Sequence, residues 1–107
     1  MRVLFDHGTP APLRRALAGH VVETAYERGW SQLKNGDLLN AAEAAGFEVL
    51  VTTDQNLRYQ QHLAARRIAV VVLSTTSWPR LSQVRGEIAA AVDRATTVAA
   101  FIEVTIP

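Results

Sequence analysis

Short apolar segments spaced along the chain constrain its fold more than any other feature. Most are continuous runs of valine, leucine or isoleucine, which is typical of strands buried on both faces of a parallel sheet. The predicted strands are residues 2–5, 20–24, 48–53, 68–73 and 101–106. Segments with helical spacing lie between them, so the pattern predicts an α/β fold in which strands and helices alternate.

Four helices are expected between these strands. The first has Pro10 or Pro12 in its first turn, Thr9 as N-cap and Gly19 at its end. Asn35 should cap the second. The second, third and fourth predicted helices comprise residues 36–45, about 56–65, and 81–95. Right-handed crossovers then favour the strand order 2-1-3-4-5, giving a three-layer α/β/α, Rossmann-like domain with a mainly parallel five-stranded sheet.

Composition narrows the class of protein. A chain of 107 residues, 49% of them hydrophobic, fits a single domain over residues 1–107. Cysteine is absent, which excludes disulfides and zinc–thiolate sites and is compatible with a reducing cytosol. No signal peptide is visible, and the longest apolar run, 68–73, is too short to span a membrane. We therefore expect a cytoplasmic protein that does not enter membranes. The net charge of +1 does not by itself indicate a nucleic-acid-binding protein.

The most informative polar residues are Asp6 and Asp54, each placed where a predicted strand ends. Ligands of open parallel sheets bind beyond the carboxyl ends of strands, at the point where the strand order reverses. In the predicted order the first and third strands flank that point, so the two carboxylates should face one crevice. Neighbouring carboxylates repel unless a proton or cation lies between them, and Mg²⁺ is the usual hard cation for such oxygens. The alternatives are an N-cap role for Asp54 and hydrogen bonding of loop N–H groups by Asp6.

Asp37 is a third candidate, in the first turn of the helix predicted to follow Asn35. A regular crossover is expected to place that helix N-terminus at the edge of the sheet away from Asp54, so residues 25–35 would have to carry Asp37 to the crevice. The alternative is a first-turn charge that only favours the helix dipole.

Other polar and aromatic residues admit two interpretations each. His7 either contacts a ligand or is solvated. Trp30 and Trp78 are expected as core or rim aromatics rather than base-stacking platforms. Four basic residues form either a phosphate-holding rim or an ordinary solvated face: Lys34, Arg58, Arg66 and Arg67. Only one glycine, Gly8, follows the first strand, so a glycine-rich phosphate loop is not present there.

Several short motifs resemble those of PIN-like domains, in particular the short single-domain bacterial group, much of it uncharacterised and some of it associated with toxin–antitoxin operons. The resemblance covers nearly the whole chain and depends on the order and spacing of the motifs. These are Val3-Leu4-Phe5-Asp6, Glu27-Arg28-Gly29-Trp30, Leu33-Lys34-Asn35-Gly36-Asp37-Leu38-Leu39, and Val49-Leu50-Val51-Thr52-Thr53-Asp54 with its continuation Gln55-Asn56-Leu57.

The resemblance implies a Mg²⁺- or Mn²⁺-dependent endoribonuclease, the toxin of a toxin–antitoxin pair. By position, Asp6, Asp37 and Asp54 correspond to the catalytic, metal-holding acids. The partners implied are RNA, a cognate antitoxin and a second copy of the chain, and we expect Lys34 and Arg58 to contact the RNA backbone.

The chain departs from the family pattern at two positions. His7 and Asn56 stand where relatives often carry further acids, which makes both of them auxiliary ligands or phosphate contacts. Fewer charges imply weaker binding of a divalent ion. The alternative is therefore a degenerate PIN-like module that binds RNA or a partner protein without cleaving it.

Overall fold

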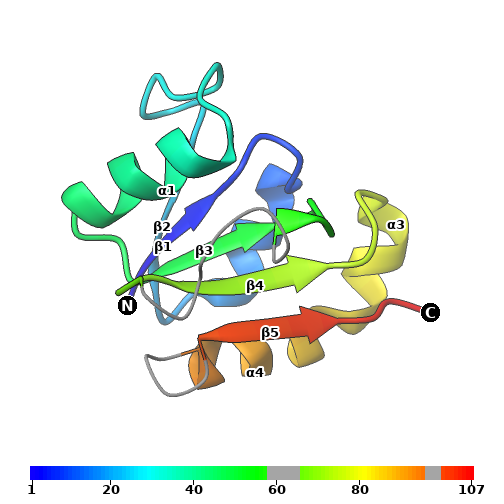
Figure 1. Ribbon diagram of the computed structural model, residues 1–107. Coiled ribbons are helices and arrows are strands. Elements are labelled where there is room, and N and C mark those ends of the chain that lie inside the picture. Colours follow the sequence, from blue (N-terminus) through cyan, green and yellow to red (C-terminus); the bar gives the residue numbers. More distant parts are fainter. Residues whose placement is uncertain (58–65, 96–99) are drawn as a thin grey trace.

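Five parallel strands form one sheet in the computed structural model, which describes residues 1–57, 66–95 and 100–107 (Figure 1). The strand order is β2-β1-β3-β4-β5, with every neighbouring pair parallel, so the predicted strand order and the α/β class are confirmed. The strands are β1 (Arg2–Phe5), β2 (Val21–Thr24), β3 (Val49–Thr52), β4 (Ala69–Leu73) and β5 (Phe101–Val104). They match the predicted segments and are shorter by one or two residues at some ends.

The helices differ more from the predictions. The first is a 3-10 helix, η1 (Ala11–Leu17), and Thr9 does not cap it, because the Thr9 hydroxyl bonds to Asp6 and to the carbonyl of Val51 instead. The second, α1 (Asn35–Ala44), begins one residue earlier than expected, with Lys34 in the N-cap position. The helix predicted over 56–65 lies almost entirely outside the described residues.

The last helical region starts three residues before the predicted range 81–95. It consists of α3 (Trp78–Leu81), η3 (Ser82–Val84) and α4 (Arg85–Arg94). Ser77 caps α3 by accepting a hydrogen bond from the Arg80 N–H, and Pro79 occupies the first turn, where its missing N–H costs nothing. These local signals explain why the helix begins before Leu81.

Apolar side chains form a core on each face of the sheet. One face packs η1, α3 and α4 against inward residues such as Val3, Val51 and Val71. The other packs α1 against Leu4, Leu50 and the residues around them. Figure 1 shows α1 on one side of the sheet, with α3 and α4 on the other. Because strand residues alternate between faces, the continuously apolar strands of the sequence supply both cores.

The direction of α1 corrects one expectation. Its C-terminal end lies at the edge where the strands begin, since the Arg2 guanidinium donates to the carbonyl of Ala45. Its N-terminus, with Asp37, therefore points toward the edge where the strands end (Figure 1). The prediction that a regular crossover places Asp37 at the opposite edge was wrong, because the helix of a parallel crossover runs antiparallel to its strands.

Among residues 1–57, 66–95 and 100–107, no helix is long and apolar enough to cross a membrane.

Candidate functional site

Asp6 lies directly beyond β1, at the carboxyl edge of the sheet, and is buried with 8% of its surface exposed. Its Oδ1 accepts hydrogen bonds from the Gly8 N–H at 3.2 Å and from the Thr9 hydroxyl at 2.7 Å. The Thr52 hydroxyl donates to its Oδ2. Asp6 therefore does what the structural alternative predicted, satisfying donors of its own loop, and it also connects β1 to β3.

The register of the sheet determines how the two aspartates are related. Phe5 pairs with Val51, so the next residues along the two strands, Asp6 and Thr52, lie level with each other. Asp54 follows two residues later, and its backbone N–H donates to the Thr52 hydroxyl at 3.0 Å. The aspartates are thus joined through Thr52, and Asp54 lies two residues further along its strand than the residue level with Asp6.

Asp54 occupies a different environment from Asp6. It is half-buried, and its Oδ1 accepts from the Asn56 N–H at 2.9 Å. This is the turn that an aspartate forms with the backbone two residues later. Whether Asp54 also caps a following helix concerns residues outside the described part of the chain.

The loops after β1 and β3 are closely packed. A Cβ atom at Gly8 would lie only 2.5 Å from the Thr53 hydroxyl oxygen, well inside contact distance. Any side chain at position 8 would therefore require the Thr53 side chain or the loops to shift. Gly8 thus allows the close approach of the two loops.

A hollow of about 450 Å³ adjoins Asp6, and His7, Gly8, Tyr26 and Ser31 also line it. His7 is exposed on this surface, which leaves its two interpretations open. Asp37 and Lys34 are exposed at the start of α1. Strand alternation places Asp6 on the face of the sheet that α1 covers, because Leu4 packs into that core.

The donor set fits a hard cation only in part. Carboxylate, amide and hydroxyl oxygens at this edge are the ligand type that Mg²⁺ and Mn²⁺ prefer. Among the described residues, however, no three histidine, cysteine, aspartate or glutamate side chains gather closely enough to hold a metal. An ion here would depend on Asp54 and Asp6, with Asn56 adding an uncharged oxygen, and Asp37 does not complete a three-acid cluster.

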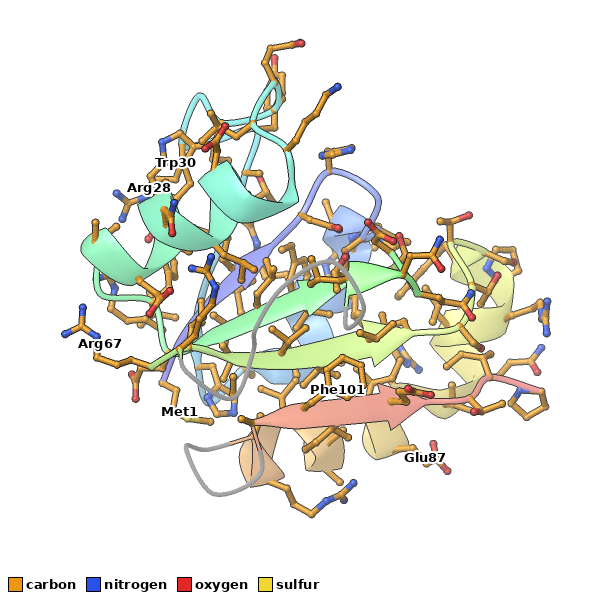
Figure 2. The ribbon with its side chains drawn as sticks, viewed as in Figure 1. Met1, Arg28, Trp30, Arg67, Glu87 and Phe101 are labelled. Atoms are coloured by element: carbon orange, nitrogen blue, oxygen red, sulfur yellow. The ribbon has the colours of Figure 1, made fainter. Side chains whose placement is uncertain are left out.

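Two of the four basic residues considered for a phosphate rim lie near the C-terminal end of α1, away from the acids. Arg66 bonds to Glu43 at 2.6 Å, and the Arg67 N–H donates to the same carboxylate at 3.0 Å. Figure 2 shows Arg67 near Met1, at the edge where the strands begin. Arg66 and Arg67 therefore do not flank the acids. Arg58 lies outside the described residues, so its predicted RNA contact stays a prediction, as does that of Lys34.

Sequence reasoning missed Thr9 and Thr52, the hydroxyl donors that hold Asp6. A usable signal was present, since Thr52 ends a fully buried strand and a buried hydroxyl must find a partner. Sequence reasoning also did not predict that three arginines line one groove, because no single helix or motif contains all of them. They are Arg14, Arg15 and Arg85.

No family model, curated protein or solved structure matches the chain.

Proposed function

We propose that this protein is a PIN-like, metal-dependent endoribonuclease of the cytoplasm, the toxin component of a toxin–antitoxin pair. One observation carries the proposal. Asp6 and Asp54 follow neighbouring parallel strands at the switch point of the sheet and are tied together through the Thr52 hydroxyl. This is the place where open parallel sheets bind ligands. The motif resemblance supplies the reaction class.

Each acid has a distinct part in the proposed site. Asp54 is the more accessible carboxylate and would hold a Mg²⁺ or Mn²⁺ ion directly, and Asp6 would present its charge from a fixed position. Asp37 would orient water from the start of α1, and His7 and Asn56 would contact a phosphate or the ion. The ion, when bound, would polarise the phosphodiester and activate water.

The test is cleavage of single-stranded RNA in Mn²⁺ or Mg²⁺ by the purified protein and by Asp54→Asn. The variant keeps an oxygen for the Asn56 N–H and loses the charge, so it should fold while its cleavage rate falls by more than roughly a hundredfold. Loss of a direct ligand should exceed that figure, which is the upper range for residues that only support a ligand. Asp93→Asn is the matched control, because Asp93 is an exposed acid on α4, away from this edge. Equal loss in both variants would contradict a role specific to Asp54.

The second candidate function is a degenerate PIN-like module that binds RNA or a partner protein without cutting. The hydrogen bonds of Asp6 favour this second function. Three donors within the protein already occupy the carboxylate that a metal would need. Under this alternative, the native protein and Asp54→Asn would show the same residual cleavage. A cognate antitoxin and a homodimer belong to the leading proposal, and co-purification with the product of the neighbouring gene, followed by light scattering, tests both.

A further inference from the structure

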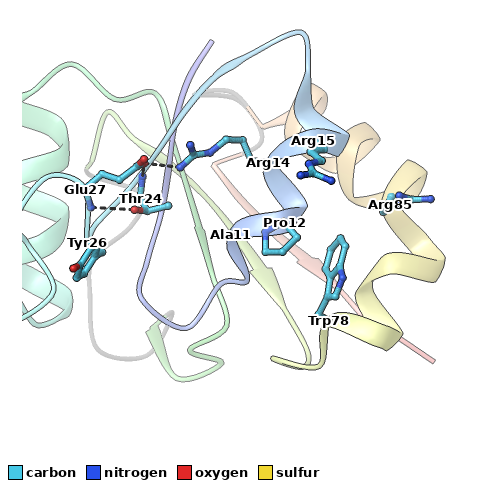
Figure 3. A pocket seen from close by; sticks show the side chains of 9 residues that line it. All are labelled: Ala11, Pro12, Arg14, Arg15, Thr24, Tyr26, Glu27, Trp78 and Arg85. Atoms are coloured by element: carbon cyan, nitrogen blue, oxygen red, sulfur yellow. Dashed lines mark hydrogen bonds and ion pairs between the residues drawn. The ribbon is translucent and has the colours of Figure 1, made fainter.

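A groove of about 820 Å³ lies beside η1, on the side of the sheet opposite α1. Arg14 and Arg15 from η1, Arg85 from the start of α4, and the aromatic residues Tyr26 and Trp78 line it. Figure 3 shows Tyr26 and Trp78 on opposite sides of Pro12, with Arg14 turned toward Glu27. The groove thus brings together residues from four separate parts of the chain.

This groove adjoins the hollow beside Asp6. The two share Ala11, Thr24 and Tyr26 as lining residues. The groove also shares Arg15 and Arg85 with a smaller hollow along η1 and α4. The three hollows therefore follow one another along the surface, from Asp6 past Tyr26 to the two arginines. That shape suits an extended ligand rather than a compact small molecule.

The groove is cationic, although the chain as a whole is almost neutral. Its lining has three arginines and one glutamate, and Glu27 is already paired with Arg14 at 2.5 Å. Bonds from the Thr24 N–H and from Arg14 lower the pKa of Glu27, which keeps this pair charged and mutually neutralised. Arg15 and Arg85 are exposed, and their guanidinium groups have no hydrogen bond or ion pair with other described residues. Two positive charges are thus left for an anionic ligand.

The aromatic residues add a second requirement. Tyr26 is 78% exposed, which is unusual for so large a ring and leaves a face open where the two hollows meet. Trp78 packs partly against the core and presents the rest of its indole to the groove. Nucleobases stack on such rings without regard to sequence, and phosphates pair with arginine.

We propose that this groove binds single-stranded RNA, with phosphates on Arg15 and Arg85 and bases stacked on Tyr26 and Trp78, so that the strand leads to Asp6 and Asp54. An alternation of stacking surface and cation matches the alternation of base and phosphate in a polynucleotide, whereas an acidic peptide would use the arginines alone. The choice of RNA rests on the proposed function, but binding by the groove requires neither metal nor cleavage.

The experiment measures binding of a fluorescent, roughly twelve-nucleotide single-stranded RNA by anisotropy in EDTA, at several salt concentrations, since such grooves span on the order of 4–16 nucleotides. Arg15→Gln and Arg85→Gln should each reduce the slope of log K against log salt by about 0.7, the contribution of one phosphate contact on a single strand. Arg94→Gln is the matched control, because Arg94 lies on α4 outside the groove. Tyr26→Ala should weaken binding roughly fivefold or more, as expected for loss of one stacked base.

The outcomes separate this inference from the proposed function. A native protein that binds RNA through the groove but never cleaves it would sink only the nuclease proposal. Salt slopes unchanged in Arg15→Gln and Arg85→Gln would overturn the groove proposal, as would equal losses in Arg94→Gln. An acidic peptide that binds through Arg15 and Arg85 while RNA does not would also overturn it, in favour of a protein partner.

Discussion

Two loops at the carboxyl edge of the sheet, residues 6–9 after β1 and residues 53–56 after β3, contain the same turn. In each, an aspartate Oδ1 accepts a hydrogen bond from the N–H two residues later, at 3.2 Å for Asp6 and 2.9 Å for Asp54. Each aspartate also contacts Thr52, Asp6 through its carboxylate and Asp54 through its backbone N–H. Their surroundings differ, because Asp6 is buried and Asp54 is half-buried.

This difference shows that the same local motif can stabilise the fold in one loop and face a ligand in the other. Asp6 accepts from two threonine hydroxyls in addition to its turn bond, so both of its carboxylate oxygens are hydrogen-bonded within the protein. Hydrogen bonds to an ionised group are among the stronger ones, and an unpaired buried donor is costly. We therefore expect Asp6 to contribute mainly to stability and Asp54 mainly to ligand binding.

The largest expected effect is that of removing each carboxylate in turn. Asp6→Ala should lower the free energy of unfolding by about 3 kcal/mol, because it leaves the buried Thr52 and Thr9 hydroxyls with fewer partners. Asp54→Ala should cost about 1 kcal/mol, the usual loss for a turn or cap bond at a half-exposed position. Urea unfolding at neutral pH measures both. Losses of equal size would show that burial does not distinguish the two loops.

Much of this edge could be predicted from the sequence, because it depends on patterns within single segments. Apolar runs gave the five strands and their order, and Asp6 and Asp54 were placed correctly at strand ends. The level of one aspartate relative to the other could not be predicted, since it depends on strand register. That register pairs Phe5 with Val51, and it is set by the packing of the two strands in the folded sheet.

The hydrogen bonds of Thr9 and the groove beside η1 also could not be predicted from the sequence, because both depend on tertiary contacts. Thr9 has the local sequence of a helix cap, but its hydroxyl bonds to Asp6 and to the neighbouring strand, so a tertiary contact overrides the local preference. The groove beside η1 combines Arg15 with Arg85 from distant parts of the chain. Helical spacing indicates which face of a segment is polar, but it does not indicate which polar faces meet.

The second-largest expected effect on stability comes from disturbing the packing between the loops after β1 and β3. Gly8→Ala should destabilise the protein by about 2 kcal/mol, because the new Cβ would meet the Thr53 hydroxyl at 2.5 Å and small-to-large changes in packed sites typically cost about 1–3 kcal/mol. Adding Thr53→Ala removes the clashing oxygen, so the double variant should recover most of the loss. Gly19→Ala is the control, since nothing lies within 4 Å of a Cβ there. Additive losses in the double variant would show that the loops are not in contact.

The smallest expected effect on stability is that of replacing Glu43, an acid at the other edge of the sheet. It serves as a reference for the two aspartates. Glu43 is paired with Arg66, and their side chains are 15% and 18% exposed. Burial opposes ionisation of Glu43, but the hydrogen bonds from Arg66 and the Arg67 N–H, with their charges, outweigh it and leave its pKa below the ordinary value of 4.5. A lowered pKa in the folded state contributes stability above the unfolded pKa, and this contribution is lost as the pH falls through the folded value.

Glu43→Gln should therefore lower the free energy of unfolding by about 1 kcal/mol at pH 7, the upper range measured for surface ion pairs, and by less at pH 3, which lies below the unfolded pKa, where this contribution is being lost. Urea unfolding at the two pH values checks this, with Glu87→Gln on the exposed start of α4 as the control. A loss that is the same at both pH values would mean that Glu43 acts through packing rather than charge. A loss that depends on pH would show the stability that a paired carboxylate contributes through its charge. The losses measured for the buried Asp6 and the half-buried Asp54 can then be compared with it.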